Sequence, residues 1–338
     1  MTDFFKAVRG FLLEYLPRQR CLSENTIVSY KAGINLLIEF LRHEKHLKID
    51  EIKFALFNRD MILDFLNWLE EKRKCSVSSR NQRLMVLRSF FEYAGTIDGT
   101  LVALQLEVAK IPPKKQEGRM VEYLSEDALQ TLLLQPNTTK PIGIRDQFFM
   151  TLMYDTAARC GEILNLRVRD IRLKPKHSEV YLTGKGSKPR AVALLGRTVE
   201  LYNRYMRIYH KHSNPDDYLF YTVIHGIRNR MSADTVAAFM RKYGESARRK
   251  CPEVPEKVHP HQLRHTRAIH YYRGGMPLAL VAEQLGHASP ETTKIYAYAD
   301  SDMKRKAIEK LGRNQTTNKV APIWENNEDM ILQLVGLK

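Results

Sequence analysis

Apolar residues recur three and four positions apart through residues 1–108, the spacing that places them on one face of an α-helix. The pattern predicts four helices, each with a polar face toward solvent. We expect them over 4–16, from Ser23 to about His43, over 59–72 and over about 77–93. Ser23 is a residue type favoured at a helix N-cap. The first third of the chain is therefore predicted to be all-helical.

The fourth of these helices carries three arginines among its polar positions. We expect Leu84, Met85, Leu87 and Phe91 to point inward, which leaves the polar face largely free at Arg80, Arg83 and Arg88. Free arginines can bind DNA phosphates, but they can also form an ordinary solvated helix face. The sequence leaves both interpretations of this face open.

The composition changes after the fourth helix. Residues 109–122 contain two prolines, a glycine and several charges, which is typical of a linker between domains. Residues 123–312 mix helical and strand patterns, and 313–338 form a C-terminal tail. Within the second domain, Glu179–Thr183 and Arg190–Leu194 have β-strand character and flank the turn residues GKGSK. The fold class expected is mainly α, with a small antiparallel β-sheet in the C-terminal domain.

Most of the second domain is predicted to be helical. Helices are expected from Ser125, over 145–157, over 199–210 and over about 233–250. Three short helices follow within residues 259–298. Pro260 begins the first, Gly286 ends the second near 278–285, and Ser289 with Pro290 begins a third that carries Tyr296.

The tail also contains a helical pattern. Acidic residues at Glu325, Glu328 and Asp329 favour a helix start, and apolar residues follow at helical spacing over 323–337. A helix this short is marginal in water alone, so we expect it to dock on another surface, of which its own domain is the simplest.

Positive charge is concentrated in the second domain. The 338 residues carry a formal charge of +16. Residues 109–312 contain 35 basic and 21 acidic residues, a net +14, whereas residues 1–108 contain 16 and 14, a net +2. A field of this strength favours a polyanionic partner, of which nucleic acid is the usual one, although an acidic membrane surface would attract the same charge.

The remaining composition predicts a cytoplasmic protein that does not bind a membrane. Its four cysteines are scattered without a C-x-x-C pair, which fits reduced thiols and no zinc framework. Residues 4–16 include Lys6, Arg9 and Glu14, so this segment is interpreted as an amphipathic helix and not a signal peptide. No stretch approaches the ~18 apolar residues that span a bilayer.

Six short motifs of this chain carry candidate chemistry: S-x-x-T-x-x-x-Y from Ser23 to Tyr30, TAARCGEIL, TGKGSKPR, the H-x-x-R at His261, the L-G-H ending at His287 and the T-x-I-Y ending at Tyr296. Together they resemble the motifs of the tyrosine recombinases, the phage-integrase and Xer-type family. Ser23 to Tyr30 is similar to the opening of the family's helical core-binding domain, and TAARCGEIL resembles its first arginine motif. The segment TGKGSKPR resembles its β-hairpin lysine motif. The H-x-x-R at His261, the L-G-H ending at His287 and the nine-residue step to Tyr296 complete the resemblance. Ala157 departs from the pattern, because glycine is usual there, and we expect a small backbone change without loss of role.

The resemblance implies a role for each matching residue. Tyr296 is the nucleophile that forms a 3′-phosphotyrosyl link to DNA, and Lys185 is the general acid for the departing 5′ oxygen. Arg159 and Arg264 clamp the phosphate oxygens, His261 assists proton movement at the tyrosine, and His287 donates to the phosphate. Glu162 supports the arginines. Because the phosphotyrosine stores the bond energy, no cofactor and no metal are expected.

Several alternatives remain at this point. Tyr298 competes with Tyr296 as nucleophile, but the spacing from His287 favours Tyr296. His265 shares a face with Ala268 and is interpreted as a core histidine. The resemblance implies a monomer that assembles as a tetramer on two paired DNA sites, for a mobile element. A type IB topoisomerase or a catalytically silent DNA-binding regulator is the alternative function. The sequence does not reveal the DNA target.

Overall fold

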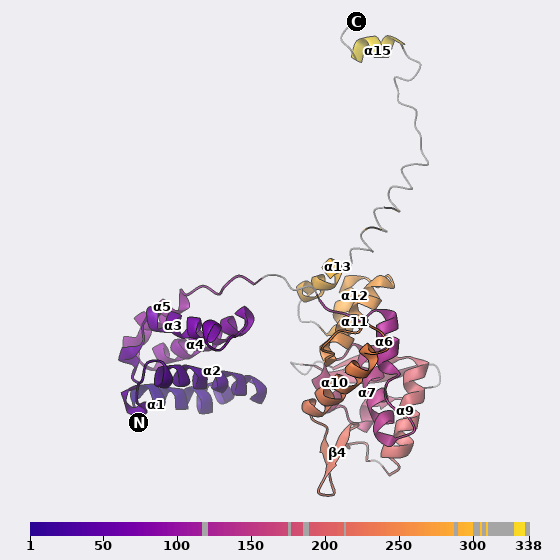
Figure 1. Ribbon diagram of the computed structural model, residues 1–338, viewed down its shortest axis with the longest axis horizontal. Coiled ribbons are helices and arrows are strands. Elements are labelled where there is room, and N and C mark those ends of the chain that lie inside the picture. The colour runs from indigo at the N-terminus through magenta and orange to yellow at the C-terminus, as the bar shows by residue number, and fades with distance from the viewer. Residues whose placement is uncertain are drawn as a thin grey trace. The chain divides into compact units, whose positions relative to one another are not determined.

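The computed structural model describes most of the chain in two compact units, Met1–Gly118 and Arg119–Lys338 (Figure 1). The described residues are 1–116, 121–174, 177–184, 189–212, 214–286, 290–299, 305, 309 and 328–334. Helices dominate both units, and β-strands occur in the second. The expected fold class is confirmed.

The first unit is a helical bundle. Its helices are α1 (Asp3–Gly10), which continues into the π-helix η1 (Phe11–Gln19), α2 (Glu24–His43), α3 (Arg59–Glu71), α4 (Val77–Ile97) and α5 (Val102–Ala109). Short 3₁₀ turns occur at η2 (Ile49–Glu51), η3 (Phe54–Leu56) and η4 (Gly99–Leu101). The Ser23 side chain accepts from the backbone N–H of Thr26, so it caps α2 as predicted. The four predicted helices are confirmed, although α4 continues four residues further.

Aromatic side chains form the centre of this unit's core. The rings of Phe4, Phe11 and Phe90 are fully buried, and the centroid of Phe90 lies 5.5 Å from Phe4 and 5.4 Å from Phe11. Both pairs meet edge to face, the geometry that aromatic quadrupoles favour. Burial of such side chains supplies about 1.5–3 kcal/mol each, which fixes the helices around this centre.

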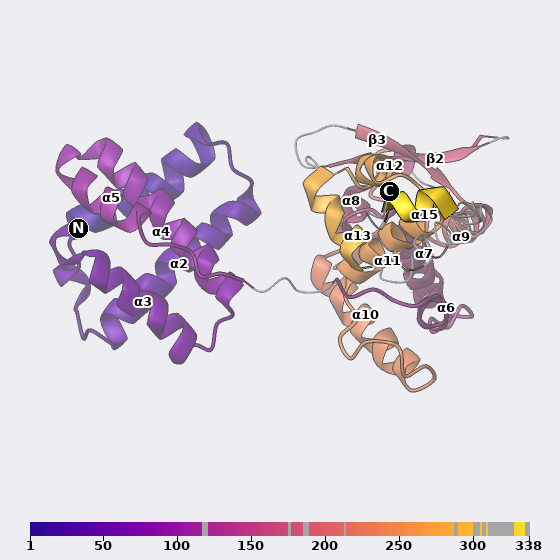
Figure 2. The same cartoon turned by 90° about the horizontal axis from the view of Figure 1, so that it is seen from above.

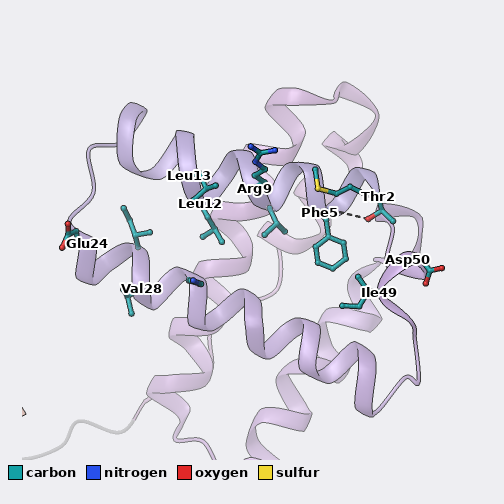
Figure 3. Close-up of a pocket in the computed structure, with 13 residues that line it drawn as sticks. Thr2, Phe5, Arg9, Leu12, Leu13, Glu24, Val28, Ile49 and Asp50 are labelled. Carbon is teal, nitrogen blue, oxygen red and sulfur yellow. Dashed lines mark hydrogen bonds between the residues drawn. The ribbon is translucent and has the colours of Figure 1, made fainter.

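An apolar groove lies between the first and second helices of this unit (Figure 3). Its volume is about 990 Å³. Leu12 and Leu13 line it from η1, and Val28 lines it from α2. Leu13 and Val28 are largely exposed, so this face of the bundle is apolar on its outside as well as in its core.

The arginines of α4 do not form the free face that the sequence predicts. Arg80 is buried, with its Nε 3.8 Å from a carboxylate oxygen of Glu70. Arg83 and Arg88 are half-buried and donate to the backbone carbonyls of Ser29 and Ile111. Met85, expected inside, is 53% exposed. The predicted core residues Leu84, Leu87 and Phe91 are buried, so the helix faces the core as expected, but this face also includes Arg80. The DNA-binding role of these three arginines stays a prediction.

The linker expected over residues 109–122 begins earlier in the sequence than the structure indicates. Residues 102–109 form α5, whose run VALQLEVA is too uniformly apolar to show helical periodicity. Ile111 is fully buried in the first unit's core. The Lys114 backbone N–H donates to Asn81 at 3.0 Å, and its ammonium lies 2.7 Å from Glu70. The chain thus remains packed on the first unit as far as residue 114.

The second unit is built around α7 (Pro141–Thr156), which is buried along most of its length. The other helices are α6 (Glu126–Leu133), α8 (Cys160–Asn165), α9 (Gly196–Tyr209), α10 (Ala233–Arg248), α11 (Pro260–Arg273), α12 (Leu278–Leu285) and α13 (Lys294–Ala299), with 3₁₀ turns η5 (Val168–Asp170) and η6 (Pro290–Thr293). Figure 1 shows α11 beside α7 and α12, both of which it contacts. Every helix predicted in this unit up to residue 299 is confirmed within a few residues. In the tail, the described part of the predicted helix is α15 (Glu328–Leu334).

Two small antiparallel sheets complete the second unit. β1 (Ile171–Arg172), β2 (Ser178–Thr183) and β3 (Pro189–Leu194) form the first, with Thr183 opposite Pro189 at the turn end of the predicted hairpin. Figure 2 shows β2 and β3 along one side of this unit, near α8 and α12. The second sheet is the hairpin of β4 (Tyr221–Ile224) and β5 (Ile227–Arg230), which the sequence did not predict.

The second unit buries its apolar residues in two separate clusters. The larger surrounds α7, and its aromatic centre includes Phe148, Phe149 and Phe220. The smaller lies among α11, α12 and α13, and it contains Ile269, Leu285 and Tyr296. The predicted nucleophile is therefore held in a small core of its own. None of the described helices is long and apolar enough to cross a membrane.

Candidate active site

The site begins where α7 ends. Ala157 adopts the left-handed conformation at φ 50° and is fully buried, so the backbone keeps the shape that glycine favours. An alanine in this conformation carries a strain of about 1–2 kcal/mol. The small change of backbone expected here relative to glycine stays a prediction. The turn aims the Ala157 carbonyl at the Arg264 guanidinium, whose Nη1 donates to it at 2.8 Å.

Arg159 and Glu162 are joined through the first turn of α8. The Arg159 backbone N–H donates to Glu162 Oε2 at 2.8 Å, and its Nη1 donates to Oε1 at 3.1 Å. The Arg159 side chain is 37% exposed, whereas that of Glu162 is 5% exposed. The buried carboxylate therefore orients the Arg159 side chain and leaves part of its guanidinium accessible to solvent.

Arg264 lies deeper in the site. It projects from α11, is buried, and donates from Nη2 to the Leu285 carbonyl at 2.8 Å as well as to Ala157. Burial, and to a lesser extent Arg159 nearby, lower the pKa of Arg264 to about 10. The group is still charged at neutral pH, so it contributes a full positive charge to a partly desolvated site.

Arg190 of β3 is the residue that sequence reasoning missed. Its Nη1 and Nη2 donate to the two oxygens of Glu162 at 3.0 and 2.8 Å, and its Nε donates to the Gln284 carbonyl at 2.9 Å. The signal was present, because Arg190 ends the TGKGSKPR motif. Only the lysine of that motif was assigned a role.

Three arginines meet at the C-terminal end of α12. Arg190 donates to the carbonyl of Gln284, Arg264 to that of Leu285, and Arg159 Nη2 to that of Gly286 at 3.3 Å. The last carbonyls of a helix carry partial negative charge and lack partners within the helix. The arginines satisfy these carbonyls and fix the turn immediately before residue 287.

Tyr296 is only 1% exposed, and its hydroxyl lies 2.9 Å from Nδ1 of His265. Burial raises the pKa of the phenol above its ordinary value, and the nearby charges of Arg264 and Arg159 oppose that shift. The same arginines that contact α12 are therefore close enough to act on the tyrosine electrostatically.

His265 of α11 lies next to this tyrosine, and the ring of His261, one turn earlier in α11, has its centroid 6.3 Å from that of His265. Burial lowers the pKa of His265 to about 4, with the neighbouring His261 and Arg264 adding to the effect. Burial and the charge of Arg264 lower the pKa of His261 as well, although part of its ring is exposed. Both imidazoles are thus neutral at pH 7 and able to accept a proton. His265 is half-buried as expected, but it contacts the predicted nucleophile, which its core interpretation missed.

The described residues bring together Arg159, Glu162, Arg264 and Tyr296 of the predicted set, with His261 on the adjacent turn of α11. Lys185 and His287 lie outside the described residues, as does the side chain of Tyr298. Within the described ranges, no three histidine, cysteine or acidic side chains form a group that could hold a metal ion.

Comparison with known proteins identifies the family. Residues 122–303 match the phage integrase family, and residues 11–96 match the phage integrase N-terminal SAM-like domain. A tyrosine recombinase of Pseudothermotoga lettingae is 29% identical over 299 residues, covering 88% of this chain and 96% of the relative. Tyrosine recombinase XerC of Vibrio vulnificus is 29% identical over 287 residues, 85% of each chain.

The fold is also found among solved structures. The XerH site-specific recombinase bound to palindromic difH substrate superposes with a TM-score of 0.65 at 21% identity, covering 86% of this chain and 80% of that one. This similarity supports the fold. Because the phage integrase match alone spans more than half of the residues, this chain belongs to that family and is a site-specific recombinase of the tyrosine class.

Proposed function

We propose that this recombinase cuts and rejoins double-stranded DNA through a covalent link between Tyr296 and a 3′ phosphate. One observation carries the proposal: the Tyr296 hydroxyl lies in a small core within the electrostatic reach of two arginines. Those arginines come from separate helices and converge on adjacent carbonyls of α12. A phosphate is the substrate group that two converging guanidinium groups fit best.

The chemistry follows from the charges of the transition state. The tyrosine oxygen attacks phosphorus, the bond from phosphorus to the 5′ oxygen breaks, and charge builds on the non-bridging oxygens. Arg159 and Arg264 stabilise that charge, and loss of one such donor typically costs on the order of a hundredfold in rate. Reversal of the same steps, with a 5′ hydroxyl as nucleophile, rejoins the strand.

Two protons must move during cleavage. The phenol loses one, and a neutral imidazole at His261 is available to accept it. The departing 5′ oxygen gains one, which we assign to Lys185.

Attack also requires that Tyr296 leave its buried contact with His265, because a hydroxyl on a side chain 1% exposed cannot reach a DNA phosphate. The arrangement described here is therefore a resting state.

The assembly we propose is a tetramer formed by monomers on two paired DNA sites. The fold is shared with a lambda integrase whose tetramer is bound to a Holliday junction. It is shared as well with a Tn1549 transposon integrase bound to transposon right-end DNA, which favours a mobile element as the substrate. The net +14 carried by residues 109–312 supplies the attraction for such a partner.

A pool of nicked duplexes with a randomised core tests the proposal without knowledge of the target. Full-length protein should form a denaturant-resistant adduct with a subset of the pool, in excess EDTA, and Tyr296→Phe should not. Tyr298→Phe is the matched control and should still form the adduct. An adduct that survives in Tyr296→Phe contradicts the assignment. Relaxation of a plasmid that lacks every captured sequence would instead indicate a topoisomerase.

A further inference from the structure

The Arg190–Glu162 pair lies where three elements of the proposed active site meet. Glu162 is in α8, Arg159 is the N-cap residue of that helix, and Arg190 is in β3. Four hydrogen bonds converge on the buried carboxylate: two from Arg190, one from the Arg159 side chain and one from the Arg159 backbone. The fifth donor of the cluster, Nε of Arg190, fixes the last turn of α12 through Gln284.

Two glycines show how closely the backbone approaches this pair. A Cβ at Gly184, which precedes Lys185, would lie 3.1 Å from Glu162 Oε1 and 3.7 Å from Arg190 Nη1. A Cβ at Gly286, which precedes His287, would lie 2.9 Å from Arg190 Nη1. The residues before both predicted catalytic side chains therefore rest against the same ion pair, although they are about a hundred positions apart in the sequence.

The charges explain why a second arginine is needed. Burial alone would raise the pKa of Glu162, but the hydrogen bonds from Arg190 and from the Arg159 backbone hold it below its ordinary value. Glu162 is therefore an anion. If Arg190 were absent, that anion would have Arg159 as its one side-chain ion-pair partner among the contacts described, and the two charges would cancel. With Arg190 bound in a bidentate arrangement, Glu162 can orient Arg159 without neutralising it.

We propose that Arg190 is a positioning residue for strand cleavage. Its bidentate bond to Glu162 keeps the charge of Arg159 available to the scissile phosphate. Its contacts with Gly184, Gly286 and Gln284 set the backbone from which Lys185 and His287 project. In this assignment Arg190 acts through Glu162 and the end of α12 and does not touch the reacting atoms. This inference rests on the proposed function.

The test is a double-mutant cycle in the full chain, measured as single-turnover cleavage of a nicked duplex captured by the wild type. Arg190→Gln should slow cleavage roughly tenfold or more, the scale typical of residues that orient a catalytic group. The dissociation constant for the duplex should change less than about threefold, because phosphate contacts elsewhere dominate affinity. Arg190→Lys, which restores the charge but not the bidentate geometry, should lie between wild type and Arg190→Gln.

The second arm of the cycle separates positioning from general destabilisation. In Arg190→Gln the Glu162 anion captures Arg159, so adding Glu162→Gln should recover part of the lost rate. The double variant should depart at least about threefold from the product of the two single losses. Arg145→Gln is the matched control, because the Arg145–Asp146 pair is equally buried at 2.8 Å and makes no described contact with the site. It should lower the unfolding temperature and leave cleavage within about twofold.

The outcomes are distinct. The positioning role would be overturned if Arg190→Gln cleaved at the wild-type rate, or if Arg190→Gln and Arg145→Gln slowed cleavage equally. It would also be overturned if the rate loss of the double variant equalled the product of the two single losses. Failure of the wild type to form any phosphotyrosyl adduct would instead overturn the proposed function itself.

Discussion

Among single residues, the contact between Tyr296 and His265 tells most about the state of the enzyme. Burial raises the pKa of the phenol and lowers that of the imidazole, so proton transfer between them is unfavourable in this arrangement. The tyrosine is held neutral, buried and hydrogen-bonded. If Tyr296 is the nucleophile, as we propose, DNA binding must replace this contact before attack, and the arrangement is a resting state that does not cleave.

Lys185 is the residue whose role chemistry can test most selectively. Lys185→Ala should slow cleavage of an ordinary phosphodiester by about a hundredfold or more, the range of general acid catalysis. It should slow cleavage of a duplex with a 5′-bridging sulfur far less, because a thiolate leaves without a proton. Single-turnover rates on the two duplexes decide the matter. Equal losses on both would remove Lys185 from this role.

For individual residues, the sequence motifs predicted which residues belong to the site better than they predicted the contacts between those residues. The arginine motif located Arg159 and Glu162, which the structure joins at 3.1 Å. Motifs could not show that Arg190 holds Glu162, or that His265 contacts Tyr296. Both contacts depend on how a strand and a helix far apart in sequence pack together, and no local spacing encodes that packing.

At the scale of elements, periodicity predicted the long helices well because their buried faces repeat at regular intervals. It failed for α5, whose residues are apolar almost throughout, and for the β4–β5 hairpin, whose strand β5 is exposed along its length. The orientation of α4 was predicted correctly for Leu84, Leu87 and Phe91, but Met85 faces solvent and Arg80 is buried beside Glu70. At the edges of a helix face, tertiary packing decides which side chains are covered.

Gly286, at the C-terminal end of α12, is the glycine on which the site depends most. It has φ +62°, and Arg190 Nη1 lies 2.9 Å from the position that a Cβ would occupy. Gly286→Ala should destabilise the protein by about 1–2 kcal/mol from backbone strain and also displace Arg190, so cleavage should fall. Gly226→Ala is the matched control, since Gly226 has φ +78° with open space around it. It should lose similar stability and keep its cleavage rate. Equal rates in the two variants would contradict the account of this turn.

At the scale of the whole molecule, the second unit should be sensitive to acid. Burial lowers the pKa values of His210, His261, His265 and His270, that of His265 to about 4. Between that value and the unfolded pKa of about 6.5, the unfolded chain binds more protons than the folded one. The free energy of unfolding should therefore fall as pH decreases through this window. The Glu162 contribution is lost only below its ordinary pKa, so it does not mask the effect.

Urea denaturation followed by circular dichroism at pH 7 and pH 5 measures this prediction. The midpoint should be lower at pH 5, and His265→Asn should reduce the difference between the two conditions. A midpoint that does not change with pH in the wild type would contradict the prediction.

The C-terminal tail, residues 313–338, is expected to act in the assembly of subunits on DNA. The apolar pattern around α15 predicts a helix that docks, and the resemblance to the family suggests a neighbouring subunit as its partner. Removal of residues 313–338 should spare binding to a single site and weaken both the pairing of two sites and strand exchange. Gel-shift titration with one-site and two-site DNA separates these steps. A truncated protein that pairs sites and recombines like the full chain would disprove the role.

In the proposed mechanism, Tyr296 becomes covalently bound to the DNA. The most direct measurement is mass spectrometry of the peptide recovered from the denaturant-resistant adduct after protease and nuclease digestion. The account predicts a nucleotide joined through its 3′ phosphate to Tyr296, from a reaction run in EDTA. A nucleotide on Tyr298 or on any other residue, or one joined through a 5′ phosphate, would contradict it.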